Sequence, residues 1–147
     1  MSSDIKRYSL HASIGYQSTL TSRVFERRLE ESLKPVGLTR LNWCILLALI
    51  EEKLTSPSDI AEFVGIDRTA TSRALRHMER DGLIERGTGR NDRSPTQEAR
   101  NRLDRAIPGA LSNAEHFANK LTQEDREKLA TLLQRMREGE AAFLKTL

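Results

Sequence analysis

The stretch TSPSDIAEFVGIDRTATSRALRHMERDGLIER, residues 55–86, decides the fold, because it reads as a helix, a tight turn, a second helix and a strand. Ser56 followed by Pro57 predicts the first helix start, since serine accepts from free backbone N–H groups and proline fixes the first dihedral angle. Gly65 favours a left-handed end to this helix, and Asp67 offers the next N-cap. The two helices are joined by about three residues, which predicts a helix-turn-helix.

The second helix of this stretch has a packing side and a cationic side when its residues are spaced by about 100°. Thr71, Ala74, Leu75 and Met78 fall on the packing side, and Thr69, Ser72, Arg73, Arg76 and Arg80 gather on the other. Arginine makes bidentate bonds to guanine or phosphate, and small hydroxyl groups make adaptable contacts, so the second side suits the DNA major groove. The alternative is a solvated charged face. With neighbouring segments included, the candidate DNA-contacting residues are Ser56, Arg68, Thr69, Thr71, Ser72, Arg73, Arg76, Arg80, Arg90 and Arg93.

Charge is concentrated in the same part of the chain. The 147 residues include 24 Lys and Arg and 21 Asp and Glu, a net charge of +3. Residues 68–93 hold seven arginines and four acids, which accounts for the whole cationic excess. Arginine favours bidentate phosphate and base contacts. A small net charge argues against indiscriminate coating of nucleic acid.

Composition indicates a mostly helical protein, with 5% aromatic, 37% hydrophobic and 31% charged residues. The sequence has no apolar run of membrane-spanning length, and its N-terminus lacks a signal-peptide core. We therefore expect a cytoplasmic protein.

The segment before the helix-turn-helix predicts two helices. Residues 9–33 carry an imperfect apolar stripe, which Pro35 and Gly37 end. Thr39 is a good N-cap for the next helix, and the run of residues 43–50 is apolar all round. A helix that is apolar all round belongs in the interior, so we expect this helix at the centre of the core.

Two further helices are predicted at the C-terminal end. Thr96 can cap the first of them, which Pro108-Gly109 should bend or weaken. Thr122 begins the last helix, whose apolar residues continue to Leu147. The terminal helices have more apolar surface than a domain of this size needs, and we therefore expect them to pair with a second copy in a homodimer.

Between the helices, residues 83–86 predict a short strand, and the segment 87–93 forms turns throughout. Asp81-Gly82 ends the second helix of the helix-turn-helix, which comes before this strand. Arg90 and Arg93 lie in or beside this loop, where they are candidates for a minor-groove arm, because narrow grooves attract inserted arginine. An ordinary hairpin is an equal alternative.

Taken together, the chain resembles the multiple-antibiotic-resistance regulator (MarR) family of bacterial winged helix-turn-helix repressors over nearly its whole length. The matching residues are Gly37-Leu38-Thr39 with Asn42-Trp43, Ser58 to Ala61, Gly65 to Asp67, Thr69 to Arg73, Met78 to Ile84 with Arg86, Asp92-Arg93, and Thr96. The resemblance implies one mostly α-helical domain over residues 1–147 with a small β-wing at 84–96. It implies dimerisation helices at 9–35 and 97–147 around a DNA-binding part at 38–96.

The resemblance also implies a function for the chain. It implies a repressor that binds a palindromic operator on double-stranded DNA and is controlled by a small ligand, often an aromatic acid or phenol, in a cleft between the dimer and DNA-binding parts. His11, Tyr16 and Trp43 are candidates to line that cleft, although aromatic and histidine residues in helices are more often core.

The chain departs from the family pattern where the wing should return. The family has Asp-x-Arg, a strand of alternating apolar residues, and then Leu-Thr-x-x-Gly. Here Asp92-Arg93-Ser94 lacks the second arginine, while Pro95 and Ala99 stand in place of the leucine and the glycine. We therefore expect a shortened wing without its second strand.

Other functions have weaker support in the sequence. The three histidines lie in separate segments without metal-ligand spacing, and there is no phosphate loop or nucleophile elbow, so we expect no enzyme activity, no metal and no cofactor. One alternative is a helical interaction protein on a winged-helix scaffold. Another is a thiol-redox regulator, but the only cysteine, Cys44, lies in the apolar run, where buried thiols are usually inert.

Overall fold

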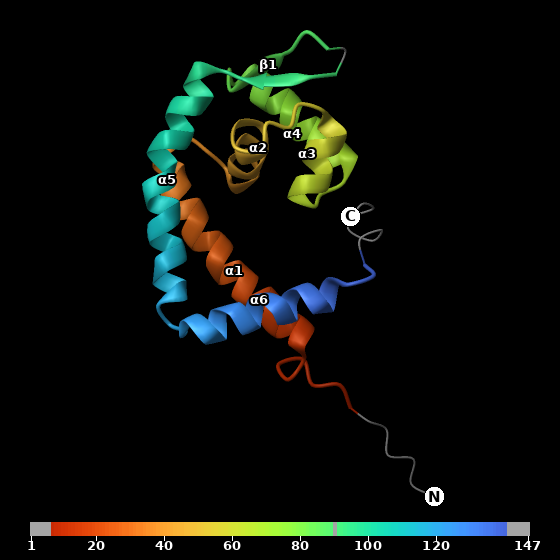
Figure 1. Ribbon diagram of the computed structural model, residues 1–147, viewed down its shortest axis with the longest axis vertical. Helices are drawn as coiled ribbons and strands as arrows, with labels where there is room; N and C mark the ends of the chain where they lie inside the picture. Colours follow the sequence, from red (N-terminus) through yellow and green to blue (C-terminus); the bar gives the residue numbers. More distant parts are fainter. Residues whose placement is uncertain (1–6, 90, 141–147) are drawn as a thin grey trace, which may run out of the picture.

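The computed structural model describes residues 7–89 and 91–140 (Figure 1). Along the chain the elements are α1 (Ile14–Leu33), the 3-10 turn η1 (Lys34–Val36), α2 (Arg40–Ile50), α3 (Pro57–Val64), α4 (Arg68–Arg80), β1 (Ile84–Arg86), β2 (Arg93–Pro95), α5 (Gln97–Ala118) and α6 (Gln123–Arg137). Helices with one small antiparallel sheet confirm the predicted fold class.

The predicted N-caps all form in the structure. Each cap side chain accepts a hydrogen bond from the backbone N–H three residues later, at Thr39, Ser56, Asp67, Thr96 and Thr122. Gly65 ends α3 with φ +80°, in the left-handed region that glycine tolerates best. The start of α1 differs from the expected residue 9, because the helix begins after Ser13, whose hydroxyl accepts from the backbone N–H of Tyr16.

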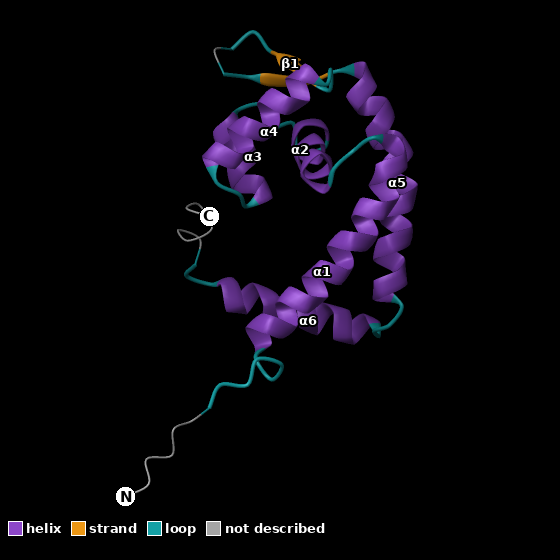
Figure 2. Cartoon of the chain, turned by 180° about the vertical axis from the view of Figure 1, so that it is seen from behind, coloured by secondary structure: helices purple, strands orange, loops and turns teal. Residues whose placement is uncertain are grey.

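The centre of the core is α2, as its apolar sequence predicts. Ile45, Leu46, Ala48 and Leu49 are buried on it. Figures 1 and 2 place α2 between α3, α4 and the upper part of α5. Buried side chains from α1, α3, α4, β1 and α5 complete one cluster, including Leu33, Ile60, Leu75, Met78, Ile84 and Leu103.

The wing has a second strand, so the expectation that this strand is missing was wrong. β1 and β2 pair antiparallel with Ile84 opposite Pro95 and Arg86 opposite Arg93. The backbone N–H of Arg93 also donates to Thr55 O at 2.9 Å, which holds β2 against the segment before α3. Because each strand has only three residues, no apolar alternation is long enough to mark β2 in the sequence.

The long helices α1 and α5 lie side by side and extend away from the helix-turn-helix (Figures 1 and 2). The predicted weak point, Pro108-Gly109, lies within α5, and the helix continues past it to Ala118. Gly109 lies close to Ser32 on α1. After α5 the chain turns back as α6, and no residue of α6 is buried.

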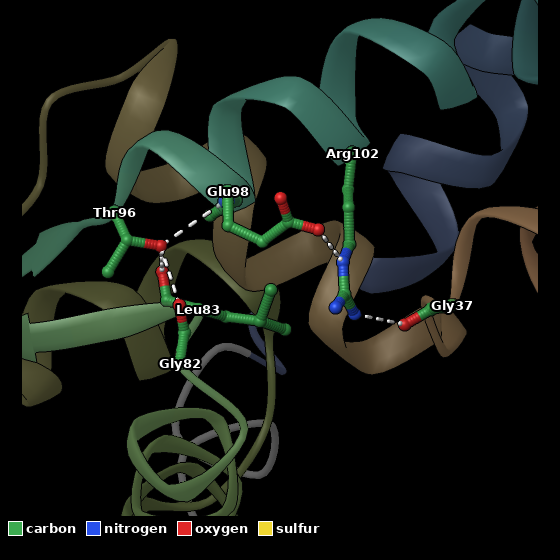
Figure 3. Close-up of polar contacts among 7 residues, drawn as sticks. Gly37, Gly82, Leu83, Thr96, Glu98 and Arg102 are labelled. Atoms are coloured by element: carbon green, nitrogen blue, oxygen red, sulfur yellow. Dashed lines mark hydrogen bonds and ion pairs between the residues drawn. The ribbon is translucent and has the colours of Figure 1, made fainter.

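Polar contacts join the start of α5 to the segment between α4 and β1 and to the turn before α2 (Figure 3). The Thr96 hydroxyl donates to Gly82 O at 2.7 Å and also lies 3.1 Å from Leu83 O. Arg102 Nε donates to Glu98 at 2.8 Å, and its Nη1 donates to Gly37 O at 3.1 Å. The first turns of α5 are therefore fixed both to the start of β1 and to the turn before α2.

Within residues 7–89 and 91–140, no single helix has both the length and the apolarity to cross a membrane. In this part of the chain, one pair of segments, Ile14–Val36 and Arg40–Ile50, reaches the required length and composition when taken together, and the two are bent by 76° to each other.

Candidate nucleic-acid interface

The second helix of the helix-turn-helix, α4, buries one side and exposes the other, as its sequence predicts. Thr71, Ala74, Leu75 and Met78 are buried against the core. The opposite side is exposed to solvent and carries Arg68, Thr69, Ser72, Arg73, Arg76 and Arg80. Because α3 and the capped turn at Asp67 precede it, the structure forms the helix-turn-helix that the sequence indicates.

The arginines on this side differ in their partners. Among the described residues, Arg68, Arg73 and Arg76 form no ion pair. Arg80 places one guanidinium nitrogen 3.0 Å from His77 Nδ1, which accepts when its proton is on the other ring nitrogen. Guanidinium groups without a protein carboxylate keep their donors available for phosphate or a base edge.

Thr71 does not belong to this surface, although we included it among the candidate DNA contacts. Its side chain has 0% exposure, and its hydroxyl donates to Asp67 O at 2.8 Å. Ser56 is half-buried at the start of α3, where its hydroxyl accepts from the backbone N–H of Asp59. The N-cap role of Ser56 leaves it at a helix N-terminus, which is a favourable place for a phosphate.

Arg93 is likewise not an exposed arm. Its side chain is 10% exposed, and Arg93 Nε lies 2.8 Å from Glu79 Oε1 in an ion pair that is not aligned as a hydrogen bond. Arg93 Nη1 donates to Asn91 O at 2.8 Å. These contacts turn Arg93 inward toward α4, so we remove it from the candidate DNA contacts. Arg90, the other candidate in this loop, lies outside the described residues.

Two residues that were not among the candidate DNA contacts complete this cluster. Glu79 on α4 pairs with Arg93 and also lies 3.7 Å from Arg86 Nε. The side chain of Arg86 is 66% exposed. This cluster could be predicted only from the strand register, which places Arg86 opposite Arg93. The register is known only once β2 is known.

Within the described residues, the candidate ligand residues lie in two separate places, the start of α1 and the core side of α2. His11 and Tyr16 pack edge to face near the start of α1, with ring centroids 5.4 Å apart. Trp43, in contrast, packs against the core from α2. A groove of about 400 Å³ lies elsewhere, between α1 and α5, and is lined by Phe25, Leu29, Ala110, Asn113, Ala114, Phe117, Ala118 and Leu121.

This groove is apolar with a polar and cationic edge. The rings of Phe25 and Phe117 meet edge to face with centroids 4.2 Å apart. Arg28 and Lys120 place their charges 5.9 and 5.5 Å from the centre of the Phe117 ring. From the sequence, the helices that carry these aromatic rings were predicted to be dimerisation helices. The contact between the two rings was not predicted.

Cys44 is half-buried on α2. Burial raises the pKa of its thiol, and the nearby charge of Arg40 opposes this to a smaller extent. A raised pKa keeps the group as a thiol at neutral pH, which is the less reactive form.

A helix-turn-helix followed by a two-stranded wing defines the winged helix-turn-helix class of proteins. A family model described as the MarR family matches residues 36–93, which cover α2, α3, α4, β1 and the start of β2. The uncharacterized HTH-type transcriptional regulator YwoH of Bacillus subtilis (strain 168) is 21% identical over 132 residues, which cover 87% of this chain and 93% of that protein.

Solved structures show the same fold. The transcriptional repressor CouR bound to p-coumaroyl-CoA matches with a TM-score of 0.82 and 22% identity, over 92% of this chain and 99% of that one. Sco3205, a MarR family regulator from Streptomyces coelicolor in complex with DNA, matches with a TM-score of 0.76 and 21% identity, over 90% and 93% of the two chains. The family model matches the winged helix-turn-helix of this chain, and the solved structures share its fold over most of its length.

Proposed function

We propose that the protein is a sequence-specific DNA-binding repressor that reads its operator with the exposed side of α4. The observation that carries this proposal is the set of arginines on that side without a carboxylate partner among the described residues, in particular Arg73 and Arg76. Arg68, Thr69, Ser72 and Arg80 extend the same surface, and Ser56 flanks it at the start of α3. The DNA complex of Sco3205, which has the same fold, supports this assignment.

Residues 38–96 act in this proposal as the DNA-binding part, and residues 9–35 and 97–147 as the dimerisation helices. Exposed apolar side chains support the second assignment, because Leu129, Leu132, Leu133 and Met136 on α6 are 36–50% exposed. A monomer rarely leaves such a stripe in water. A two-fold dimer presents two copies of α4, so the operator is a palindrome.

A small apolar or aromatic ligand releases the repressor from DNA in this proposal. CouR, which binds p-coumaroyl-CoA, supports it by its shared fold. The groove between α1 and α5 offers such a ligand an apolar floor, and Asn113 offers it a polar group. Because α5 is tied through Thr96 and Arg102 to the helix-turn-helix, a ligand that moves α5 would also move α4.

The test is to select bound fragments from a pool of genomic DNA and to measure their affinity as salt is raised. A DNA-binding repressor selects one palindromic sequence, and its affinity falls steeply with salt because phosphate contacts release counterions. Aromatic acids and acyl thioesters are then screened for release of the selected duplex. If no sequence is enriched and no salt-dependent binding is found, the chain is an interaction protein on a winged-helix scaffold.

A further inference from the structure

One side chain of α6 reaches back to the end of α5. Arg126 is half-buried, whereas the other residues of α6 are exposed. Arg126 Nη1 donates to Ala118 O at 2.8 Å and to Leu121 O at 3.0 Å. Its Nη2 donates to Gln123 Oε1 at 2.6 Å. Among the described residues, Arg126 is the only residue of α6 whose side chain hydrogen-bonds to α5.

These contacts stabilise the end of α5 and fix the start of α6. The last carbonyl groups of a helix have no donor inside the helix and carry its partial negative charge, so a guanidinium group stabilises them. Other arginines pair within their own helix, as Arg27 does with Glu31 on α1 at 3.4 Å, where both side chains are exposed. Arg126 instead joins two helices across the turn at 119–122. Because its guanidinium group is planar and donates in three directions, it restricts the direction in which α6 leaves this turn.

The apolar stripe of α6 lies on the same side of the helix as Arg126. Leu129 and Leu133 follow Arg126 by three and seven residues, a spacing that keeps them on one side of a helix. Leu132 and Met136 lie beside them, and all four side chains are 36–50% exposed. The contact of Arg126 with α5 therefore also sets the direction in which this stripe faces.

A change in the angle between α5 and α6 is amplified along α6. Figure 1 shows that α6 leaves the lower end of α5 in a new direction. The helix has 15 residues, so it is about 22 Å long at about 1.5 Å per residue. A rotation of about 10° at its first turn would move its far end by about 4 Å. Neighbouring base pairs are about 3.4 Å apart, so such a change can shift a DNA half-site by one base pair.

We propose that Arg126 is a positioning residue that sets the angle between α5 and α6, and that this angle fixes the distance between the two copies of α4 in the homodimer. Arg126 thereby determines which half-site spacing of an operator the protein accepts. This inference rests on the proposed function, because it needs a dimer joined through α6 and a palindromic operator. The side chains of α4 select the sequence of each half-site, and Arg126 selects the distance between the half-sites.

The first experiment measures the distance between the two copies of α4 without DNA. In a Cys44→Ser background, Ser72→Cys places one spin label on the exposed side of each α4, and double electron–electron resonance gives the distribution of distances between the labels. Arg126→Met removes the donors and keeps the aliphatic stem. It should displace or widen this distribution by about 3 Å or more, the rise of one base pair. Arg126→Lys keeps a charged donor, so its change should be smaller and in the same direction.

The second experiment measures the affinity of unlabelled protein for the selected palindrome and for duplexes with one base pair added or removed at its centre. Each base pair moves the half-sites by about 3.4 Å and turns them by about 35°. Loss of simultaneous binding costs about 100-fold or more, so the wild type should have one sharp optimum. Arg126→Met should reduce this penalty about tenfold, or move the optimum by one base pair. Its affinity for a duplex with a single half-site should equal that of the wild type.

Arg135→Met is the matched control, because Arg135 is exposed on the same helix and its loss removes the same charge. It should keep the wild-type distances and optimum. The inference is overturned if Arg126→Met keeps either the distance distribution or the spacing optimum of the wild type, or if Arg135→Met changes them equally. It is also overturned if Arg126→Met sediments as a monomer, since Arg126 would then hold the dimer together and not set its geometry. A wild type that binds no DNA, or that sediments as a monomer, contradicts the proposed function instead.

Discussion

Residues of one type have different roles in this molecule according to their burial. Thr69 and Thr71 are two positions apart on α4, yet Thr69 is exposed and Thr71 is fully buried. Arg86 and Arg93 face each other in the wing, yet only Arg93 is turned inward. Residue type therefore identifies candidates for DNA contact, and burial selects among them.

Thr71→Val and Thr69→Val separate these roles. Thr71→Val removes the hydrogen bond to Asp67 O, which should cost about 0.5–1.5 kcal/mol of folding free energy and leave operator affinity unchanged. Thr69→Val should leave stability unchanged and weaken operator binding. Urea unfolding and anisotropy titrations check both. Equal loss of affinity in the two variants would mean that Thr71 acts on DNA after all.

Cys44→Ser should leave the response to effectors unchanged. Burial raises the pKa of this thiol above its ordinary value, so the reactive thiolate form is scarce at neutral pH and becomes available only as the pH rises toward that raised pKa. Operator release by peroxide is measured for both proteins. Release of the wild type by peroxide, together with a resistant Cys44→Ser variant, would establish the thiol-redox alternative.

At the scale of elements, the Thr96 hydroxyl contributes two kinds of contact to the junction between α5 and the wing. Thr96 caps α5 through the backbone N–H of Ala99 and donates to Gly82 O (Figure 3). Glu98 and Arg102 in the next turn fix the same end of α5 to Gly37. These contacts, together with the shared apolar core, connect the proposed dimerisation and DNA-binding parts.

Thr96→Ala should lower the free energy of unfolding by about 1–2 kcal/mol, because loss of a threonine N-cap alone typically costs that much. Thr131→Ala is the control, since Thr131 is exposed on α6 and donates only to the backbone of Glu127. The free energy of unfolding of Thr131→Ala should differ from that of the wild type by no more than about 0.5 kcal/mol. Urea titrations of both variants compare them, and equal effects would contradict a special role for Thr96.

Local signals made most of the elements predictable. N-cap residues such as Ser56, Asp67 and Thr122 accept a hydrogen bond from the backbone N–H three residues later. Because this contact is local, the sequence alone predicts it. The strand β2 was not predictable, because it is held by Thr55 and by β1, which are distant in sequence. The inward turn of Arg93 and the groove between α1 and α5 depend on such distant contacts too.

At the scale of the whole molecule, the helix α6 contributes no buried side chain to the core. No residue of α6 is buried, and its apolar side chains Leu132 and Leu133 are 41% and 36% exposed. Burial of one such side chain contributes about 1.5–3 kcal/mol, so several together favour association with a second copy. The proposed homodimer gives this helix a partner.

Sedimentation should therefore report twice the chain mass of 16.7 kDa. A Leu132→Glu/Leu133→Glu double variant should shift the population to monomers and weaken operator binding, because two half-sites are no longer held together. Gln134→Glu adds a charge on the same helix without removing an apolar side chain, and it should stay dimeric. A folded monomer at micromolar concentration for the wild type would contradict the dimer.

The reading of the operator by the exposed side of α4 is the step on which the proposed function rests. It is tested most directly by the ratio of affinities for the selected and a scrambled duplex, measured by anisotropy for the wild type, Arg73→Ala, Arg76→Ala and the control Arg27→Ala. Loss of a bidentate base contact costs about 1–3 kcal/mol, so at least one α4 variant should lower the ratio about tenfold or more. The control should keep the wild-type ratio. If both α4 variants keep it as well, this helix does not read DNA.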